Sequence, residues 1–251
     1  MSGHSKWAKI KHQKASEDAR KGKLFTKLGR ELAVAAREGV DPDTNFALRL
    51  AIERARMANM PKDTIERAIK RGSGETKGKE FEEITYEGYG PHGTALMLEV
   101  LTDNRNRAVN AIRTLLSRHN GNLGETGCVA WLFEQKGFIT IELNETEDPE
   151  ERALSAIDAG ADDVNIVDGA IEIYTASDNF QRVKEVLEGE GFHPTTAELS
   201  MIPKSFVQLD EKAALQIMRL VEELEELEDI RQVYSNIDIP DGIMAKYEME
   251  K

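Results

Sequence analysis

Several features that define common protein classes are missing from this sequence. One cysteine among 251 residues, Cys128, cannot form an intramolecular disulfide, which is typical of a protein in a reducing compartment. No uninterrupted apolar run approaches the roughly 18 residues that a membrane-spanning helix needs. The N-terminus also lacks the apolar segment of a signal peptide. Because 40% of the residues are nevertheless hydrophobic, we expect a folded cytoplasmic protein that does not contact a membrane.

Patterns of catalytic or metal-binding residues are also missing. The histidines are His4, His12, His92, His119 and His193. No two of them have the spacing of metal ligands. The stretch GSGETKGK is not a phosphate-binding loop, because Ser73 occupies a position that requires glycine. A catalytic triad assembled from distant residues stays open on sequence grounds. We predict no metal, no cofactor and no enzymatic activity.

Positive charge is concentrated at one end of the chain. The formal net charge is −13, yet residues 1–79 hold 19 Lys or Arg against 10 Asp or Glu. Residues 80–251 hold 14 Lys or Arg against 36 Asp or Glu. A basic segment on an acidic protein indicates nucleic acid or another anionic surface as its partner. The alternative is a chance distribution that serves only solubility, and the acidic remainder fits a solvated surface.

Helical periodicity follows a basic arm in the first part of the chain. Apolar residues recur at helical spacing from Leu24, and this helix should stop at Gly39. A second helix follows the turn sequence DPDTN. A third begins near Pro61, which suits a first helical turn, and Gly72 should cap its end. The sequence therefore predicts a small domain of three short helices.

Strand patterns dominate from residue 80 onward. The nearly all-apolar segment ALMLEVL at 95–101 predicts a central strand buried on both faces. Residues 138–201 follow the order βαββαβ, which is the ferredoxin-like pattern. Strand and helix patterns lie on both sides of this unit. We therefore predict an α+β protein with an N-terminal three-helix domain and two α/β domains, one ferredoxin-like and inserted within the other.

The predicted boundaries follow from these patterns. They are 1–79 for the basic arm and helical bundle, 80–132 plus 203–239 for a discontinuous α/β domain, 133–202 for the inserted domain, and 240–251 for a C-terminal tail.

The segment TDNRNR breaks a local rule. It joins the central strand to a helix that Thr102 or Asp103 can cap. Arg105 and Arg107 then fall in the first helical turn, where cations oppose the helix dipole. Beside the free backbone N–H groups of that turn, they form a candidate anion site. The alternative is a salt bridge to a nearby carboxylate such as Glu82, Glu83 or Glu87.

Five segments resemble the YebC family, which includes bacterial proteins and the mitochondrial translational activator of cytochrome c oxidase subunit I. They are the N-terminal MSGHSKWAKIKHQKASEDARKGKLFTKL, ANMPKDTIERAIKRGSG at 58–74, YEGYGPHG at 86–93, LTDNRNR at 101–107, and GNLGETGCVAWLFEQKG at 121–137. The GHSKW and IKH motifs are specific to the family. One departure is Gln13, where the family often has a basic residue.

The resemblance implies a three-domain protein of a family with no known catalytic reaction. Some family members are described as DNA-binding transcriptional regulators of the bacterial cytoplasm. Others bind the ribosome and ease the synthesis of difficult sequences such as proline runs. The start of this chain resembles the bacterial members.

Charge and resemblance together predict a nucleic-acid-binding regulator of gene expression. The arm and the first helix carry the candidate contact residues Lys6, Trp7, Lys9, Lys11, His12, Lys14, Lys21, Lys23, Lys27 and Arg30. Lys and Arg position a protein on phosphates without reading sequence. Trp7 either stacks on an unpaired base, which suits RNA, or anchors the arm on the bundle.

The favoured function is a translation factor, associated with ribosomal RNA, that assists elongation through difficult sequences. One alternative is a DNA-binding transcriptional regulator. The other is a protein-binding adaptor, in which the acidic α/β domains contact the ribosome or other proteins.

Overall fold

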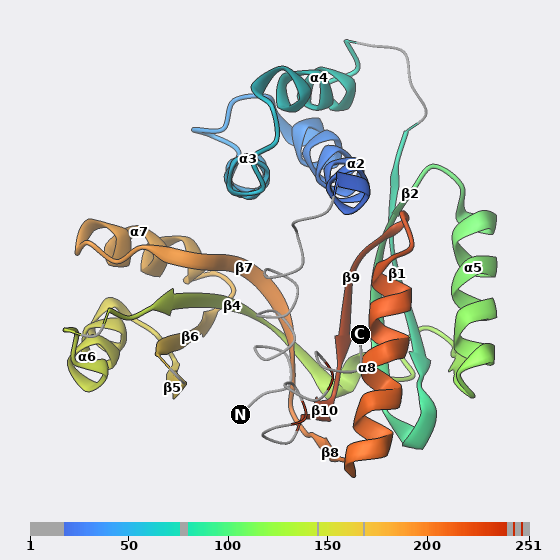
Figure 1. Cartoon of the computed structure of the whole chain (residues 1–251). Coiled ribbons are helices and arrows are strands. Elements are labelled where there is room, and N and C mark those ends of the chain that lie inside the picture. Colours follow the sequence, from blue (N-terminus) through green and yellow to red (C-terminus); the bar gives the residue numbers. More distant parts are fainter. Residues whose placement is uncertain are drawn as a thin grey trace. The chain divides into compact units, whose positions relative to one another are not determined.

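The computed structural model describes residues 18–75, 80–144, 146–167 and 169–239, together with Ile243 and Tyr247 (Figure 1). The chain divides into two compact units. One unit is the continuous segment Phe133–Pro203, and the other is formed by the chain before and after it. None of the described helices is long and apolar enough to cross a lipid bilayer.

Three helices form a bundle at the start of the larger unit. They are α2 (Asp18–Ala35), which continues as the 3-10 turn Ala36–Glu38, α3 (Phe46–Met57) and α4 (Lys62–Gly72). The side chain of Asn45 caps α3 by accepting the N–H of Leu48. Leu32, Leu48 and Ala55 are fully buried in the bundle core. The predicted helices are confirmed, although α2 begins earlier than Leu24.

The last residue of α4, Gly72, must be glycine for a reason that the sequence did not reveal. Its backbone is not left-handed, and Ser73 is the capping residue, so the prediction of a glycine cap was wrong. A Cβ at Gly72 would lie 2.1 Å from the backbone oxygen of Ala33 in α2. Only glycine therefore allows α4 to approach α2 this closely.

Gly72→Ala is expected to lower the free energy of unfolding by about 1–3 kcal/mol, because the backbone of α2 must shift. Gly22→Ala is the matched control in α2, where an added Cβ meets nothing within 4 Å. It should stabilise by about 0.5–1 kcal/mol through helix propensity. Denaturant titration measures both changes, and equal effects would contradict the close-approach explanation.

A four-stranded antiparallel sheet forms the second part of the larger unit. Its strands are β1 (Glu82–Tyr89), β2 (Ala95–Thr102), β3 (Asn122–Leu123) and β9 (Ile230–Ser235). Their order is β3-β1-β2-β9. The predicted central strand is confirmed, because β2 lies between two neighbours and buries residues on both faces.

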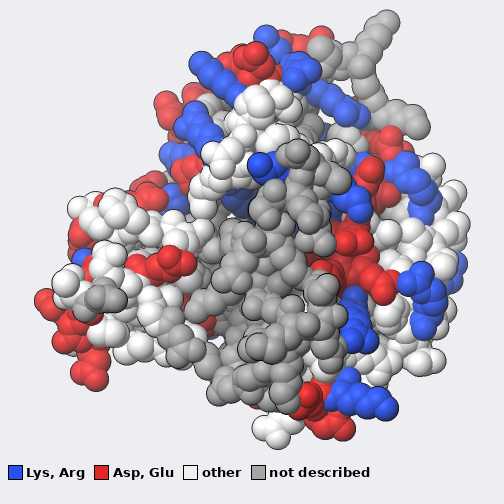
Figure 2. Space-filling model, in the orientation of Figure 1, with Lys and Arg blue, Asp and Glu red and all other residues white. Residues whose placement is uncertain are grey.

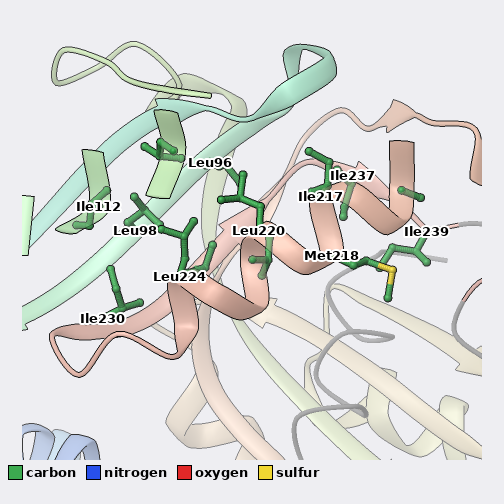
Figure 3. Close-up of a cluster of buried hydrophobic side chains, with 14 of the residues drawn as sticks. Leu96, Leu98, Ile112, Ile217, Met218, Leu220, Leu224, Ile230, Ile237 and Ile239 are labelled. Carbon is green, nitrogen blue, oxygen red and sulfur yellow. The ribbon is translucent and has the colours of Figure 1, made fainter. Parts of the chain in front are cut away.

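Helices α5 (Arg105–Arg118) and α8 (Glu211–Glu225) form one apolar core together with the strands of this sheet. Figure 3 shows Leu98 of β2, Ile112 of α5 and Leu220 of α8 within one buried cluster. Of the predicted C-terminal tail, the structure describes Ile243 and Tyr247, and both belong to this core.

The segment IRQVYSNI is two strands instead of the single strand expected from its sequence. After β9 the chain continues as β10 (Ile237–Asp238), which pairs in parallel with β8 (Val207–Gln208). Asn236 lies at the change of partner. Its side chain accepts the N–H of Ala95, and its carbonyl accepts the N–H of Val207. Asn236 thus forms hydrogen bonds with both β2 and β8, a role that strand periodicity does not indicate.

The smaller unit has the predicted ferredoxin-like order. Its elements are β4 (Phe133–Glu142), α6 (Pro149–Ala159), β5 (Asp163–Val167), β6 (Ala170–Ala176), α7 (Phe180–Gly189) and β7 (Pro194–Pro203). The antiparallel sheet order is β5-β6-β4-β7. Asp148 caps α6 before Pro149, and left-handed Gly160 ends it. The structure thus shows the predicted α+β fold, with this unit inserted within the chain of the other.

Candidate nucleic-acid interface

Most of the predicted contact residues lie on the basic arm, outside the described residues. They are Lys6, Trp7, Lys9, Lys11, His12 and Lys14. Their role in binding stays a prediction. The described part of the predicted interface begins on α2.

Lys21 and Lys23 lie exposed near the start of α2. Within the described chain neither has an ion-pair partner. The sequence KGKLFTKLGR, which contains both, holds no acidic residue. Two uncompensated ammonium groups on a folded helix are suited to phosphate contacts that position a protein without reading sequence.

Lys27 and Arg30 instead bind the last residue of α8 and the turn that follows this helix. The Lys27 ammonium donates to the backbone carbonyl of Glu225, and the Arg30 guanidinium donates to that of Glu228. Both residues thus fasten α2 to the α/β part of the same unit. Contact of Lys27 and Arg30 with nucleic acid stays a prediction, and it would require these groups to share or exchange their present partners.

Asp229 joins two arginines that are far apart in sequence. Its Oδ1 lies 2.9 Å from one terminal nitrogen of Arg30 and 2.7 Å from one of Arg107. Its Oδ2 accepts from Nε of Arg107 at 3.0 Å, and Asp103 lies 2.9 Å from the same guanidinium. The hydrogen bonds that Arg107 donates to Asp229 and then to Asp103 raise its pKa above the ordinary value.

The first turn of α5 differs from its prediction. The cap is Asn104, not Thr102 or Asp103, and its side chain accepts the N–H of Arg107. Arg107 forms the salt bridge that was left open as an alternative, but to Asp229 and Asp103 instead of Glu82, Glu83 or Glu87. Arg105 is exposed. Anion binding by these two arginines stays a prediction.

Further exposed cations lie on the bundle. They are Arg37, Arg56, Lys62, Arg67, Lys70 and Arg71. Figure 2 shows Lys and Arg side chains at the top of the view, over the helices of the bundle and mixed with acidic side chains. Their presence on the polar positions of three helices was readable in the sequence, but none of them was among the predicted contacts. They extend the candidate interface from α2 to α3 and α4.

Glu87 supports the glycine-rich loop that follows β3. It is 5% exposed. Its two oxygens accept the backbone N–H groups of Gly127, Val129 and Ala130 at 2.7–2.8 Å. Burial opposes the charge, but the three donors outweigh it and hold the pKa of Glu87 below its ordinary value. The charge of Glu87 therefore holds this loop, and Glu87 pairs with Met97, five residues before the end of β2 at Thr102 that Arg105 and Arg107 follow.

The described residues contain no group of three or more His, Cys, Asp and Glu side chains arranged to hold a metal ion. The exposed Lys and Arg side chains of α2, α3 and α4 offer ionic contacts and hydrogen bonds to phosphate oxygens.

Comparisons with known proteins extend over nearly the whole chain. The profile described as the TACO1/YebC protein N-terminal domain matches residues 5–75, and the profile of the TACO1/YebC second and third domain matches residues 81–237. A protein from Dictyoglomus turgidum is 51% identical over 97% of this chain and 98% of its own length. One from Halothermothrix orenii is 50% identical over 98% of both chains. Both are called probable transcriptional regulatory proteins.

A solved structure has the same fold. The crystal structure of a conserved hypothetical protein from Aquifex aeolicus is 46% identical in sequence, with a TM-score of 0.83. The match covers 90% of this chain and 93% of that one.

Proposed function

The chain belongs to the TACO1/YebC family, and we propose that it is a non-enzymatic regulator of gene expression that binds nucleic acid. The observation that carries this proposal is the separation of charge between residues 1–79 and residues 80–251. Exposed Lys21 and Lys23, together with the exposed cations of α3 and α4, supply a basic surface on folded elements. The acidic remainder repels phosphate, so binding is directed to the basic arm and the bundle.

Within this proposal we favour RNA of the ribosome, with a role in assisting elongation through difficult sequences. The sequence of α4 has basic residues but no Asn or Gln that would read base edges in a major groove. Asp63 and Glu66 are exposed on the same helix, so its exposed positions carry charge of both signs. These features suit a protein that contacts the backbone of a structured RNA more than one that reads an operator.

The names of the relatives favour a second candidate, a transcriptional regulator that binds DNA. Sedimentation of cell extract through a sucrose gradient separates the two candidates. Salt-sensitive co-migration with ribosomes supports the translation role. Absence from ribosomes together with promoter occupancy supports the transcription role. Co-migration that salt does not weaken would favour an adaptor that binds proteins through its α/β domains.

Four arm lysines provide the test of nucleic-acid binding itself. They are Lys6, Lys9, Lys11 and Lys14. Changing all four to Ala should flatten the slope of log K against log salt by about 3, because each neutralised phosphate releases roughly 0.7–0.9 counterions. The measurement is a salt titration of the full chain with an RNA hairpin and a DNA hairpin of the same sequence.

Trp7→Ala is the uncharged comparison in the same arm. If Trp7 stacks on a base, its loss should cost about 1–3 kcal/mol of binding free energy at every salt concentration, without a change in slope. An unchanged slope in the four-lysine variant would rule out the arm as the phosphate-binding element. The basic surface of the bundle would then be the next candidate.

A further inference from the structure

Helix α5 is basic, whereas the sequence around it is acidic. Its 14 residues, RNRAVNAIRTLLSR, contain four arginines and no acidic residue. In the remainder of residues 80–251, ten Lys or Arg stand against 36 Asp or Glu. A solvated helix face in this part of the chain is expected to be acidic, as the sequence VEELEELED at the end of α8 is.

Three carboxylates at the two ends of α5 are paired with basic side chains. Asp103 and Asp229 bind Arg107, as described above. At the other end of the helix, Glu223 of α8 binds both Arg118 and His119. Each of these carboxylates therefore already forms an ion pair within the protein.

Arg105 and Arg113 remain as surplus cations on α5. Both are exposed, and across the described ranges neither forms an ion pair. Arg105 occupies the first helical position, where the helix dipole makes a cation unfavourable for stability. Folding thus gains nothing from this charge.

Polar side chains continue from Arg113 along one stripe of the helix. Asn106, Asn110, Arg113 and Ser117 are spaced by four, three and four residues and are all exposed. This spacing places them on one face over a length of about 16 Å. Figure 2 shows basic side chains along the edge of the molecule where Figure 1 places α5. Amide, hydroxyl and guanidinium groups are the side chains that donate hydrogen bonds to phosphate oxygens.

We propose that this face of α5, with Arg105 at its start, is a second contact surface for the phosphodiester backbone of the bound nucleic acid. The inference rests on the proposed function and adds a surface outside the basic arm and bundle. Phosphates on this face would be held by Arg105 and Arg113, with hydrogen bonds from Asn106 and Asn110. The helix would thereby position the α/β part of the larger unit on the nucleic acid.

The test compares two double variants of the full chain. Arg105→Gln/Arg113→Gln removes both surplus cations, and Lys204→Gln/Lys212→Gln removes two exposed lysines of the same unit outside α5. In salt titrations with the RNA and DNA hairpins, the arginine variant should flatten the slope by roughly 0.7–0.9 for each cation lost. The lysine control should keep the wild-type slope.

A third variant, Asn106→Ala/Asn110→Ala, tests the hydrogen bonds without changing charge. It should weaken binding several-fold at every salt concentration and leave the slope unchanged. A loss with both hairpins supports recognition of the backbone shared by RNA and DNA, and a loss with one hairpin assigns the surface to that nucleic acid. Equal slopes for the arginine variant, the lysine control and the wild type would overturn the α5 surface alone. Absence of binding by the wild type would overturn the proposed function as well.

Discussion

Replacing Asp229 with alanine is expected to lower the free energy of unfolding by about 3 kcal/mol. Asp229 is 8% exposed and is bonded to both Arg30 and Arg107. Its removal would leave Arg30, with a side chain 11% exposed, as a largely buried cation that has lost its closest carboxylate. Denaturant titration of the full chain at neutral pH measures the change.

Glu228→Ala is the matched control for Asp229. Glu228 is the preceding residue and contacts the same Arg30 at 3.4 Å, but its side chain is 62% exposed. Because exposed ion pairs contribute about 0–1 kcal/mol, this variant should be close to wild type. Equal losses for the two variants would show that burial of the charge pair is not the cause.

Replacing Glu87 with alanine should cost about 3 kcal/mol of stability, because three backbone N–H groups lose a buried charged acceptor. Those groups belong to Gly127, Val129 and Ala130, so the loop that they form should also open. Amide hydrogen exchange of the three groups measures this opening. Glu125→Ala changes an exposed carboxylate of the same loop and should leave both stability and exchange near wild type.

The same residue gives stability a dependence on pH. The folded pKa of Glu87 lies below the ordinary value of a glutamate side chain. Its contribution is therefore complete above that value and is lost as the pH falls through the folded pKa. Glu87→Gln should remove this part of the acid dependence, and an unchanged pH profile would contradict the assignment.

Local patterns in the sequence were sufficient to predict most of the fold. Apolar spacing gave the helices of the bundle and the buried strand β2, because periodicity records which face of an element packs inward. The order βαββαβ was equally readable in the inserted unit. The sequence did not predict that Asn104 caps α5 or that the chain changes its strand partner at Asn236. Each feature depends on the hydrogen bond of a single side chain.

The partners of the cations could not be predicted from the sequence. Arg30 was grouped with Lys23 because both lie on the polar side of one helix, yet Arg30 binds Asp229, 199 residues further along the chain. Arg107 was grouped with Arg105 by adjacency, and only Arg107 reaches that carboxylate. Ion pairing depends on distances between atoms, which linear spacing does not give.

The amino-acid sequence by itself determined where charge accumulates and which elements form, since both follow from composition and short-range periodicity. Only the tertiary structure decided which cations of the described residues are paired with carboxylates. Folding brings Asp229 to Arg30 and Arg107 and brings Glu223 to Arg118, so these groups neutralise one another. Lys21, Lys23, Arg105 and Arg113 remain exposed. The physical reason is that a carboxylate within hydrogen-bond distance compensates the charge of a cation. Carboxylates that lie far from the cation, however many the chain contains, do not.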